Sequence, residues 1–198
     1  MHKPWGFFCY LGGDFVNYVE PIRDYNKLQD ILEYLKYENK RNYIMVMIGC
    51  YTALRISDIL RLKVKDVKNK KNITMREQKT GKQKIIPINA VLRKALEDYI
   101  KDKKEYEYLI KSREKENKAI TRDTAYKILK DIGEKFELEN VGTHTLRKTF
   151  GYHFYQQTKN IVVLQEFYNH SDPSVTLKYI GINQEAVNKA VLNFDYKE

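Results

Sequence analysis

Basic side chains followed by a tyrosine stand in a fixed order in the last third of the chain. His144 and Arg147 are three positions apart, His170 follows Asn169, and Tyr179 comes after them. Guanidinium and imidazole groups can hold the oxygens of a phosphodiester, and a phenol oxygen can attack its phosphorus. These residue types in this order therefore suit nucleophilic attack of a tyrosine on a phosphodiester held by cations.

Two further cations lie upstream. Arg55, in the segment TALRISD, directly follows an apolar run, where burial of its charge is costly unless an anion or a carboxylate meets it. Arg55 therefore grips phosphate, pairs with Asp58, or does both. Lys79, in KTGK, shares a turn with Gly81 and could protonate a leaving 5′ oxygen. The alternative for Lys79 is a solvated turn lysine.

The His144–Arg147 pair and Tyr179 each have an ordinary structural alternative. On a helix, His144 and Arg147 share a face, and a helix start at Gly142 or Thr143 would add free N–H groups that favour phosphate. The alternative is a structural histidine beside a surface arginine. Tyr179 is one of 16 tyrosines, and its ordinary pKa of about 10 means that it needs help to ionise at neutral pH.

The pattern of apolar residues predicts the elements that must position these side chains. Asp24 is expected to cap a first helix, because a stripe with helical spacing follows it. The further expected elements are a break at 40–42, a buried helix over 43–54, a short helix capped by Ser57, strands over 73–78 and 84–88, a helix from Asn89, one from Thr121, and short helices ending with an amphipathic one near 186–194. The prediction is one mainly α (α+β) domain with a small antiparallel hairpin sheet.

Composition favours a nucleic-acid partner. Lys and Arg outnumber Asp and Glu by 36 to 26, a net charge of +10, and 42% apolar residues supply a core. Such a surplus favours a polyanion, although a lysine-rich surface kept for solubility is the alternative. Cys9 and Cys50 are far apart and outside any metal motif, so we expect reduced thiols and no metal site. The apolar run 44–54 is too short to cross a bilayer.

The first 18 residues are expected to be an N-terminal extension. The segment LGGDFV is what translation of a bacterial ribosome-binding sequence followed by a GTG codon would produce. Residues 1–15 would then reflect a wrongly assigned start, with initiation at Val16. The alternative is a genuine short arm that packs on the domain or lies on DNA.

Taken together, the motifs resemble the tyrosine recombinase (phage integrase) family. The resemblance runs from about residue 19 to 194 and implies one catalytic domain over 19–198. Six positions agree with the family in identity and order, and together they are far more specific than any single short motif. The matching positions are Arg55, Lys79, His144, Arg147, His170 and Tyr179.

The resemblance implies DNA strand cleavage and rejoining without a metal, ATP or another cofactor. Arg55 and Arg147 would clamp the scissile phosphate, and His144 would transfer protons as general base and acid. Lys79 would protonate the leaving 5′ oxygen, with His170 as a supporting donor. Tyr179 would become a 3′-phosphotyrosine that retains the bond energy for religation.

The chain departs from the family pattern in two ways. Asn169 stands where the family often has glycine, which is a change at the level of packing. No N-terminal core-binding domain is evident, so the chain is expected to grip one face of double-stranded DNA, with strong salt dependence. We therefore expect self-association on DNA into a tetrameric synapse, or accessory recombination proteins. The protein is expected to be cytoplasmic and DNA-associated, and encoded by a bacterium or a phage.

Three functions remain open from the sequence. The first is a site-specific recombinase or integrase of a mobile element or phage. The second is a DNA-binding regulator that has the fold but cleaves nothing. The third is DNA relaxation by the same cleavage chemistry without exchange between sites.

Overall fold

The computed structural model describes residues 19–114, 116–182, 189 and 191–195. It confirms the predicted class: helices dominate, and a small antiparallel sheet accompanies them. The elements are α1 (Tyr25–Glu38), α2 (Lys40–Thr52), α3 (Ile56–Ile59), a 3₁₀ turn (Val64–Asp66), β1 (Asn72–Arg76), β2 (Gln83–Pro87), α4 (Ala90–Ile100), α5 (Arg122–Lys135), α6 (Thr145–Thr158), α7 (Ile161–Tyr168) and α8 (Pro173–Ile180). The expected extension over 1–18 lies outside the described residues, and so does part of the expected helix near 186–194.

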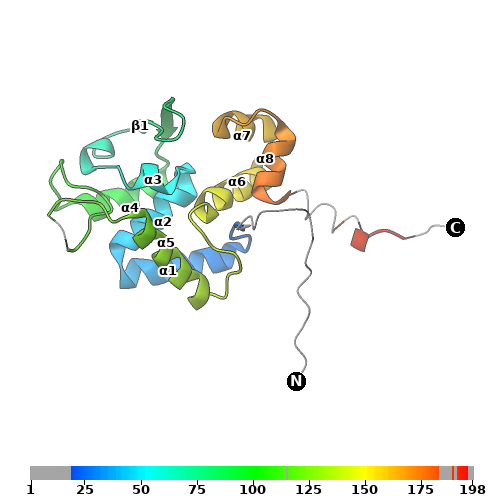
Figure 1. Ribbon diagram of the computed structural model, residues 1–198, viewed down its shortest axis with the longest axis horizontal. Coiled ribbons are helices and arrows are strands. Elements are labelled where there is room, and N and C mark those ends of the chain that lie inside the picture. The colour runs from blue at the N-terminus through cyan, green and yellow to red at the C-terminus, as the bar shows by residue number, and fades with distance from the viewer. Residues whose placement is uncertain (1–18, 115, 183–188, 190, 196–198) are drawn as a thin grey trace, which may run out of the picture.

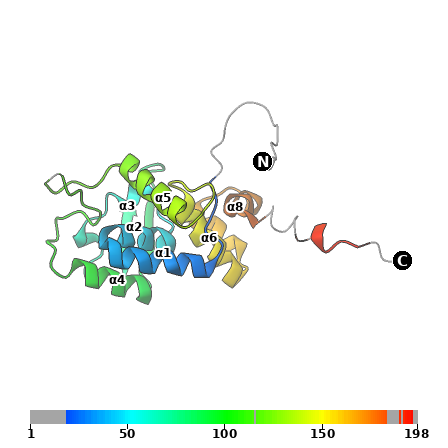
Figure 2. The ribbon, with the colours of Figure 1, turned by 90° about the horizontal axis from the view of Figure 1, so that it is seen from below.

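The elements form a helical body that continues into a smaller helical group. Figures 1 and 2 show α1 to α5 gathered on one side, with α6 leading from them to α7 and α8. Helix α2 contacts α1, α4 and α6, while α7 and α8 pack on each other and on α6. Helix α6 therefore joins the two groups, which places its first turn between them.

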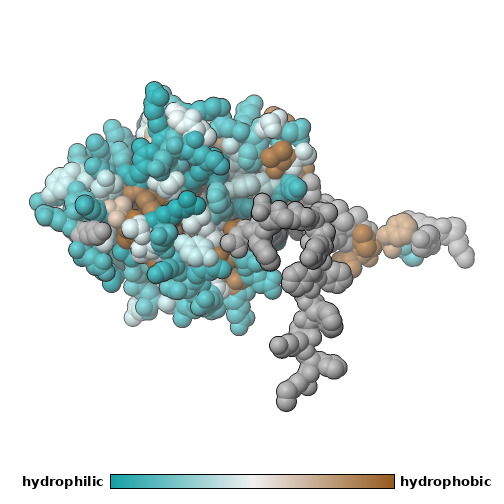
Figure 3. All heavy atoms as spheres, viewed as in Figure 1, coloured by the Kyte–Doolittle hydropathy of each residue, from teal (hydrophilic) through white to brown (hydrophobic). Residues whose placement is uncertain are grey.

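The core explains this arrangement. Nearly every residue of α2 from Ile44 onward is buried, and α1 and α4 turn their apolar stripes toward it. A second cluster around Leu164, Tyr168 and Ile180 holds α7 and α8 together. The face seen in Figure 3 is accordingly mostly hydrophilic. No helix in the described ranges is long and apolar enough to cross a membrane.

Short polar side chains set the helix boundaries, largely as predicted. The Asp24 carboxylate caps α1, and the side chains of Asn89 and Thr121 cap α4 and α5. Two expectations were wrong. Ser57 lies inside α3 rather than capping it, and the break predicted at 40–42 is the single residue Asn39, whose extended backbone separates α1 from α2.

The hairpin forms close to where the sequence placed it. Ile73 pairs with Ile86 in the register, and both side chains are buried. In β2 the burial alternates, so that Lys84 points inward beside Ile86 while Ile85 is exposed. Successive residues of a strand face opposite sides, so Lys84 and Ile86, two positions apart, share the buried face of β2.

Candidate active site

Arg55 lies where the buried helix α2 ends. Ala53 adopts a left-handed conformation at the end of α2 (φ 49°), and Arg55 then opens α3 with its side chain 17% exposed. Its guanidinium Nη1 lies 2.8 Å from a carboxylate oxygen of Glu77, next to the hairpin turn. Asp58, the partner considered from the sequence, instead accepts a hydrogen bond from the backbone N–H of Gln78 at 2.9 Å. The pairing of Arg55 with Asp58 was therefore wrong.

Helix α6 brings the second arginine to the same place. His144 is the residue that precedes α6, and Arg147 lies in its first turn, where it is 3% exposed. The Arg147 guanidinium donates to the carbonyl oxygen of Ala53 and lies 4.4 Å from the ring centroid of Tyr168. A backbone oxygen and an aromatic face thus hold this buried cation close to Arg55.

Two more candidates come from the region of helices α7 and α8. Tyr179 is in the last turn of α8, and its hydroxyl lies 3.3 Å from Nδ1 of His144. His170, just after α7, shares a hydrogen bond of 3.0 Å with the hydroxyl of Thr176, and its ring is 5.3 Å from the ring of Tyr179. The buried Tyr168 ring packs against Tyr179, His170 and Arg147.

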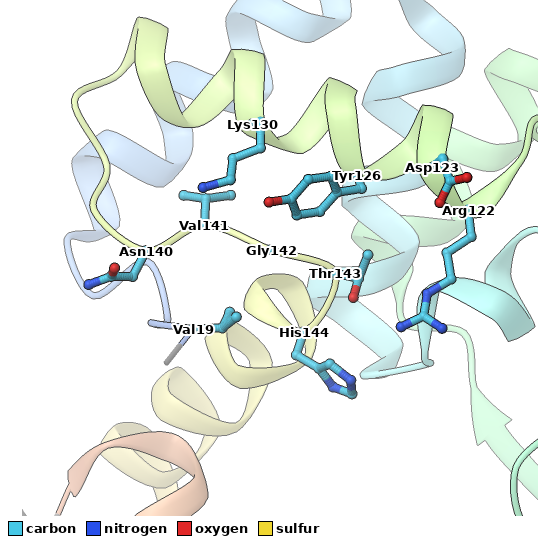
Figure 4. Close-up of a pocket in the computed structure, with 10 residues that line it drawn as sticks. All are labelled: Val19, Arg122, Asp123, Tyr126, Lys130, Asn140, Val141, Gly142, Thr143 and His144. Carbon is cyan, nitrogen blue, oxygen red and sulfur yellow. The ribbon is translucent and has the colours of Figure 1, made fainter. Parts of the chain in front are cut away.

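Lys79 lies at the edge of the same region. It is exposed on the hairpin turn, and with Arg55 and His144 it lines a cleft of about 600 Å³. A neighbouring hollow of about 460 Å³ shares His144 and Arg122 with that cleft. In Figure 4 the Arg122 side chain extends from the start of α5. It lies on the same side of the 140–144 segment as the ring of His144. All six sequence-predicted residues therefore border one cation-rich region.

The environment shifts the ionisation of these groups in opposite directions. Partial burial, and then the charges of Arg147 and other cations, lower the pKa of His144. Burial and the two arginines likewise lower the pKa of His170. Burial raises the pKa of Tyr179, although Arg147 and Arg55 oppose this. A neutral imidazole therefore faces a protonated phenol, an arrangement suited to proton transfer between them.

Three buried residues at the site were not predicted from the sequence. They are Glu77, Lys84 and Tyr168. The signal for Lys84 was available, since it has the same strand parity as Ile86. Glu77 and Tyr168 carry no comparable local signal, because their burial depends on distant elements. Within the described ranges, no three His, Cys, Asp or Glu side chains come together in a way that could hold a metal ion.

Comparison with known sequences assigns this chain to a family. The sequence model of the phage integrase family matches residues 23–186. The chain is 49% identical to the probable integrase/recombinase YoeC of Bacillus subtilis over 87% of its own length and 94% of that protein. It is 31% identical to the tyrosine recombinase XerA of Pyrococcus horikoshii over 78% of its length, but spans only 56% of that relative.

Solved structures show the same fold. A crystal structure of XerA recombinase matches with a TM-score of 0.69 and 22% identity, over 89% of this chain and 67% of the other. The catalytic domain of bacteriophage HP1 integrase matches with a TM-score of 0.58 and 21% identity, over 89% of this chain and 95% of that domain. The chain therefore belongs to the phage integrase family, together with the tyrosine recombinases.

Proposed function

We propose that this chain is a site-specific DNA recombinase that cleaves and rejoins DNA through a covalent 3′-phosphotyrosine at Tyr179. The observation that carries the proposal is the contact between Tyr179 and His144 beside two arginines from separate elements. A tyrosine kept only for packing would have no need of basic side chains around its hydroxyl.

The proposed reaction assigns one task to each of these side chains. The scissile phosphate enters beside Arg55 and Arg147, whose planar guanidinium groups are suited to holding two oxygens each. His144 accepts the phenol proton, and the Tyr179 oxygen forms a bond to phosphorus. The bond from phosphorus to the 5′ oxygen breaks, and Lys79 delivers a proton to that oxygen. Attack by a 5′ hydroxyl of a second strand reverses these steps and releases Tyr179.

Stabilisation of the transition state is the main role of the two arginines. Charge accumulates on the phosphoryl oxygens as the fifth bond to phosphorus forms, and donors already fixed in place stabilise it. The contacts of Arg55 with Glu77 and of Arg147 with the Ala53 carbonyl supply that fixation. His170, held by Thr176, serves as a further donor at the same phosphate.

Double-stranded DNA is the proposed substrate, and self-association on it the proposed assembly. Support comes from relatives of similar fold: XerH recombinase has been solved bound to its difH substrate, and a lambda integrase fragment as a dimer on a core site. The net charge of +10 suits the same partner. We propose that the chain acts on DNA in the cytoplasm, either within a tetrameric synapse or together with accessory recombination proteins.

The direct test is covalent trapping. Wild-type protein is incubated with a library of duplexes of random sequence, each nicked in one strand so that the cleaved fragment diffuses away. We expect a protein–DNA adduct that survives denaturation, and sequencing of the trapped DNA identifies the preferred site. A mobility shift without any adduct would instead indicate a regulator, and an adduct with plasmid relaxation but no exchange between sites would indicate a relaxing enzyme.

The lowered pKa of His144 predicts a characteristic dependence of cleavage on pH. Because only the neutral imidazole accepts the Tyr179 proton, adduct formation should fall on acidification only below the ordinary histidine value of about 6.5. The rate is measured with DNA well below saturation, where it reports the free protein. The acid limb should persist in His170→Gln and vanish in His144→Gln. A limb at or above pH 6.5, or one unaffected by His144→Gln, would contradict this role.

A further inference from the structure

A buried carboxylate lies between the hairpin turn and the helical body. The Glu77 residue is 3% exposed, although it directly follows β1 and precedes an exposed turn. One carboxylate oxygen lies 2.8 Å from Arg55 and 3.7 Å from the ammonium of Lys84. The other accepts a hydrogen bond of 2.7 Å from the hydroxyl of Thr80. Burying this charge is tolerated because each oxygen has a partner.

The backbone of Glu77 closes the turn that carries Lys79. The Glu77 N–H donates to the carbonyl of Lys82 at 3.0 Å, and the Gly81 N–H donates to the carbonyl of Glu77 at 2.9 Å. With the Thr80 hydroxyl, three hydrogen bonds thus attach this turn to one residue. The side chain of that residue reaches Arg55, so the carboxylate connects the turn to the phosphate-binding arginine.

The second strand of the hairpin is tied to the opposite side of the site. The Lys84 ammonium donates to the carbonyl of Phe167 at 2.8 Å and lies 4.0 Å from the Phe167 ring, in α7. Through Glu77 and Lys84, the hairpin is therefore attached both to the start of α3 and to the helix that precedes His170. Figure 1 shows the hairpin and α7 rising on the same side of the molecule.

The Glu77 carboxylate stays ionised despite its burial, as its pairing with Arg55 and Lys84 requires. Burial by itself would raise the pKa of the Glu77 carboxyl, but the hydrogen bond from Thr80 and the charges of Arg55 and Lys84 hold it below its ordinary value. The ionised carboxylate engages one edge of the Arg55 guanidinium, which has five N–H donors. The remaining donors can serve the cleft that Arg55 lines.

We propose that Glu77 is a positioning residue for strand cleavage, whose carboxylate fixes Arg55 and the Lys79 turn relative to each other. The phosphate clamp and the proton donor to the leaving oxygen are thereby set as one unit. This inference rests on the proposed function. It assigns to Glu77 no contact with DNA and no proton transfer of its own.

The test compares two leaving groups at the cleavage site. An alkoxide oxygen needs a proton as it departs, whereas a thiol ionises near pH 8.5 and leaves as a thiolate without help. Glu77→Gln keeps the size of the side chain and removes its charge. On ordinary DNA we expect its single-turnover adduct rate to fall up to about 100-fold, because small displacements of catalytic groups have such effects. With sulfur in place of the bridging 5′ oxygen, the loss should be at least about threefold smaller.

The ratio of sulfur to oxygen rates is the decisive readout, because general destabilisation would slow both substrates equally. Thr80→Val leaves the Glu77 carboxylate in place but removes its link to the turn, together with a longer hydrogen bond of 3.3 Å from the Lys82 N–H to the same hydroxyl. It should raise the ratio with a smaller overall loss. Glu97→Gln makes the same change of charge on the exposed surface of α4 and should leave the ratio unchanged.

The possible outcomes separate this inference from the proposed function. An unchanged ratio in folded Glu77→Gln would overturn the positioning role. If thermal melting shows that Glu77→Gln does not fold, Thr80→Val decides in its place, and an unchanged ratio there overturns the role. A wild-type protein that forms no adduct with either substrate would refute the proposed function itself.

Discussion

Replacement of Tyr179 by phenylalanine is expected to abolish covalent attachment to DNA while leaving DNA binding within about twofold of wild type. The variant lacks the only atom of this side chain that can bond to phosphorus, and loss of a nucleophile typically costs more than about 10⁴-fold in rate. Binding should persist because the phenylalanine ring can keep the contacts with the rings of Tyr168 and His170. The measurements are adduct yield on denaturing gels and affinity by mobility shift, at one salt concentration.

A matched control guards against a general effect of losing a phenol. Tyr106→Phe makes the same change on the exposed surface of the loop after α4 and should leave the adduct yield unchanged. Retention of more than about one hundredth of the wild-type rate in Tyr179→Phe would mean that another residue is the nucleophile.

Arg147→Lys should reduce the cleavage rate by about 10²- to 10³-fold, the usual cost of removing one donor from a charged transition state. Lysine keeps the positive charge but loses the planar fork, so it cannot contact the Ala53 carbonyl and hold two phosphate oxygens together. DNA affinity should change little, because many other cations contribute to it. Single-turnover rates at saturating DNA isolate the chemical step.

Arg113→Lys is the control for Arg147→Lys, because Arg113 is exposed on the long loop between α4 and α5. Thermal melting of both variants is needed, since Arg147 is buried and contacts Tyr168. A folded Arg147→Lys protein with near wild-type cleavage would show that this guanidinium does not hold the reacting phosphate.

Local signals explain which parts of the fold were predictable. The caps at Asp24 and Asn89 and the hairpin were predicted because short polar side chains and alternating strands act within a few residues. The break at Asn39 was misplaced because the charged run after it is compatible with a helix, and the cap is a single residue. Boundaries of this kind depend on one side chain rather than on a pattern.

Contacts between distant segments were predictable only in part. The order of the six candidate residues could be read from the chain, but their grouping depends on α6 bridging two helical clusters. The partner of Arg55 was mistaken for Asp58 because Asp58 is near in sequence, whereas Glu77 reaches Arg55 only when the hairpin folds back over α3. The left-handed Ala53, whose carbonyl meets Arg147, likewise has no signature in the sequence.

Mass spectrometry of the trapped adduct tests the central claim most directly. Wild-type protein joined to its cleaved DNA is digested with nuclease and trypsin, and the peptide that carries a nucleotide is sequenced. We predict a 3′-phosphonucleotide on the hydroxyl of Tyr179, in the peptide that begins after Lys178. A nucleotide on any other residue, or a 5′-phosphate linkage, would contradict the account.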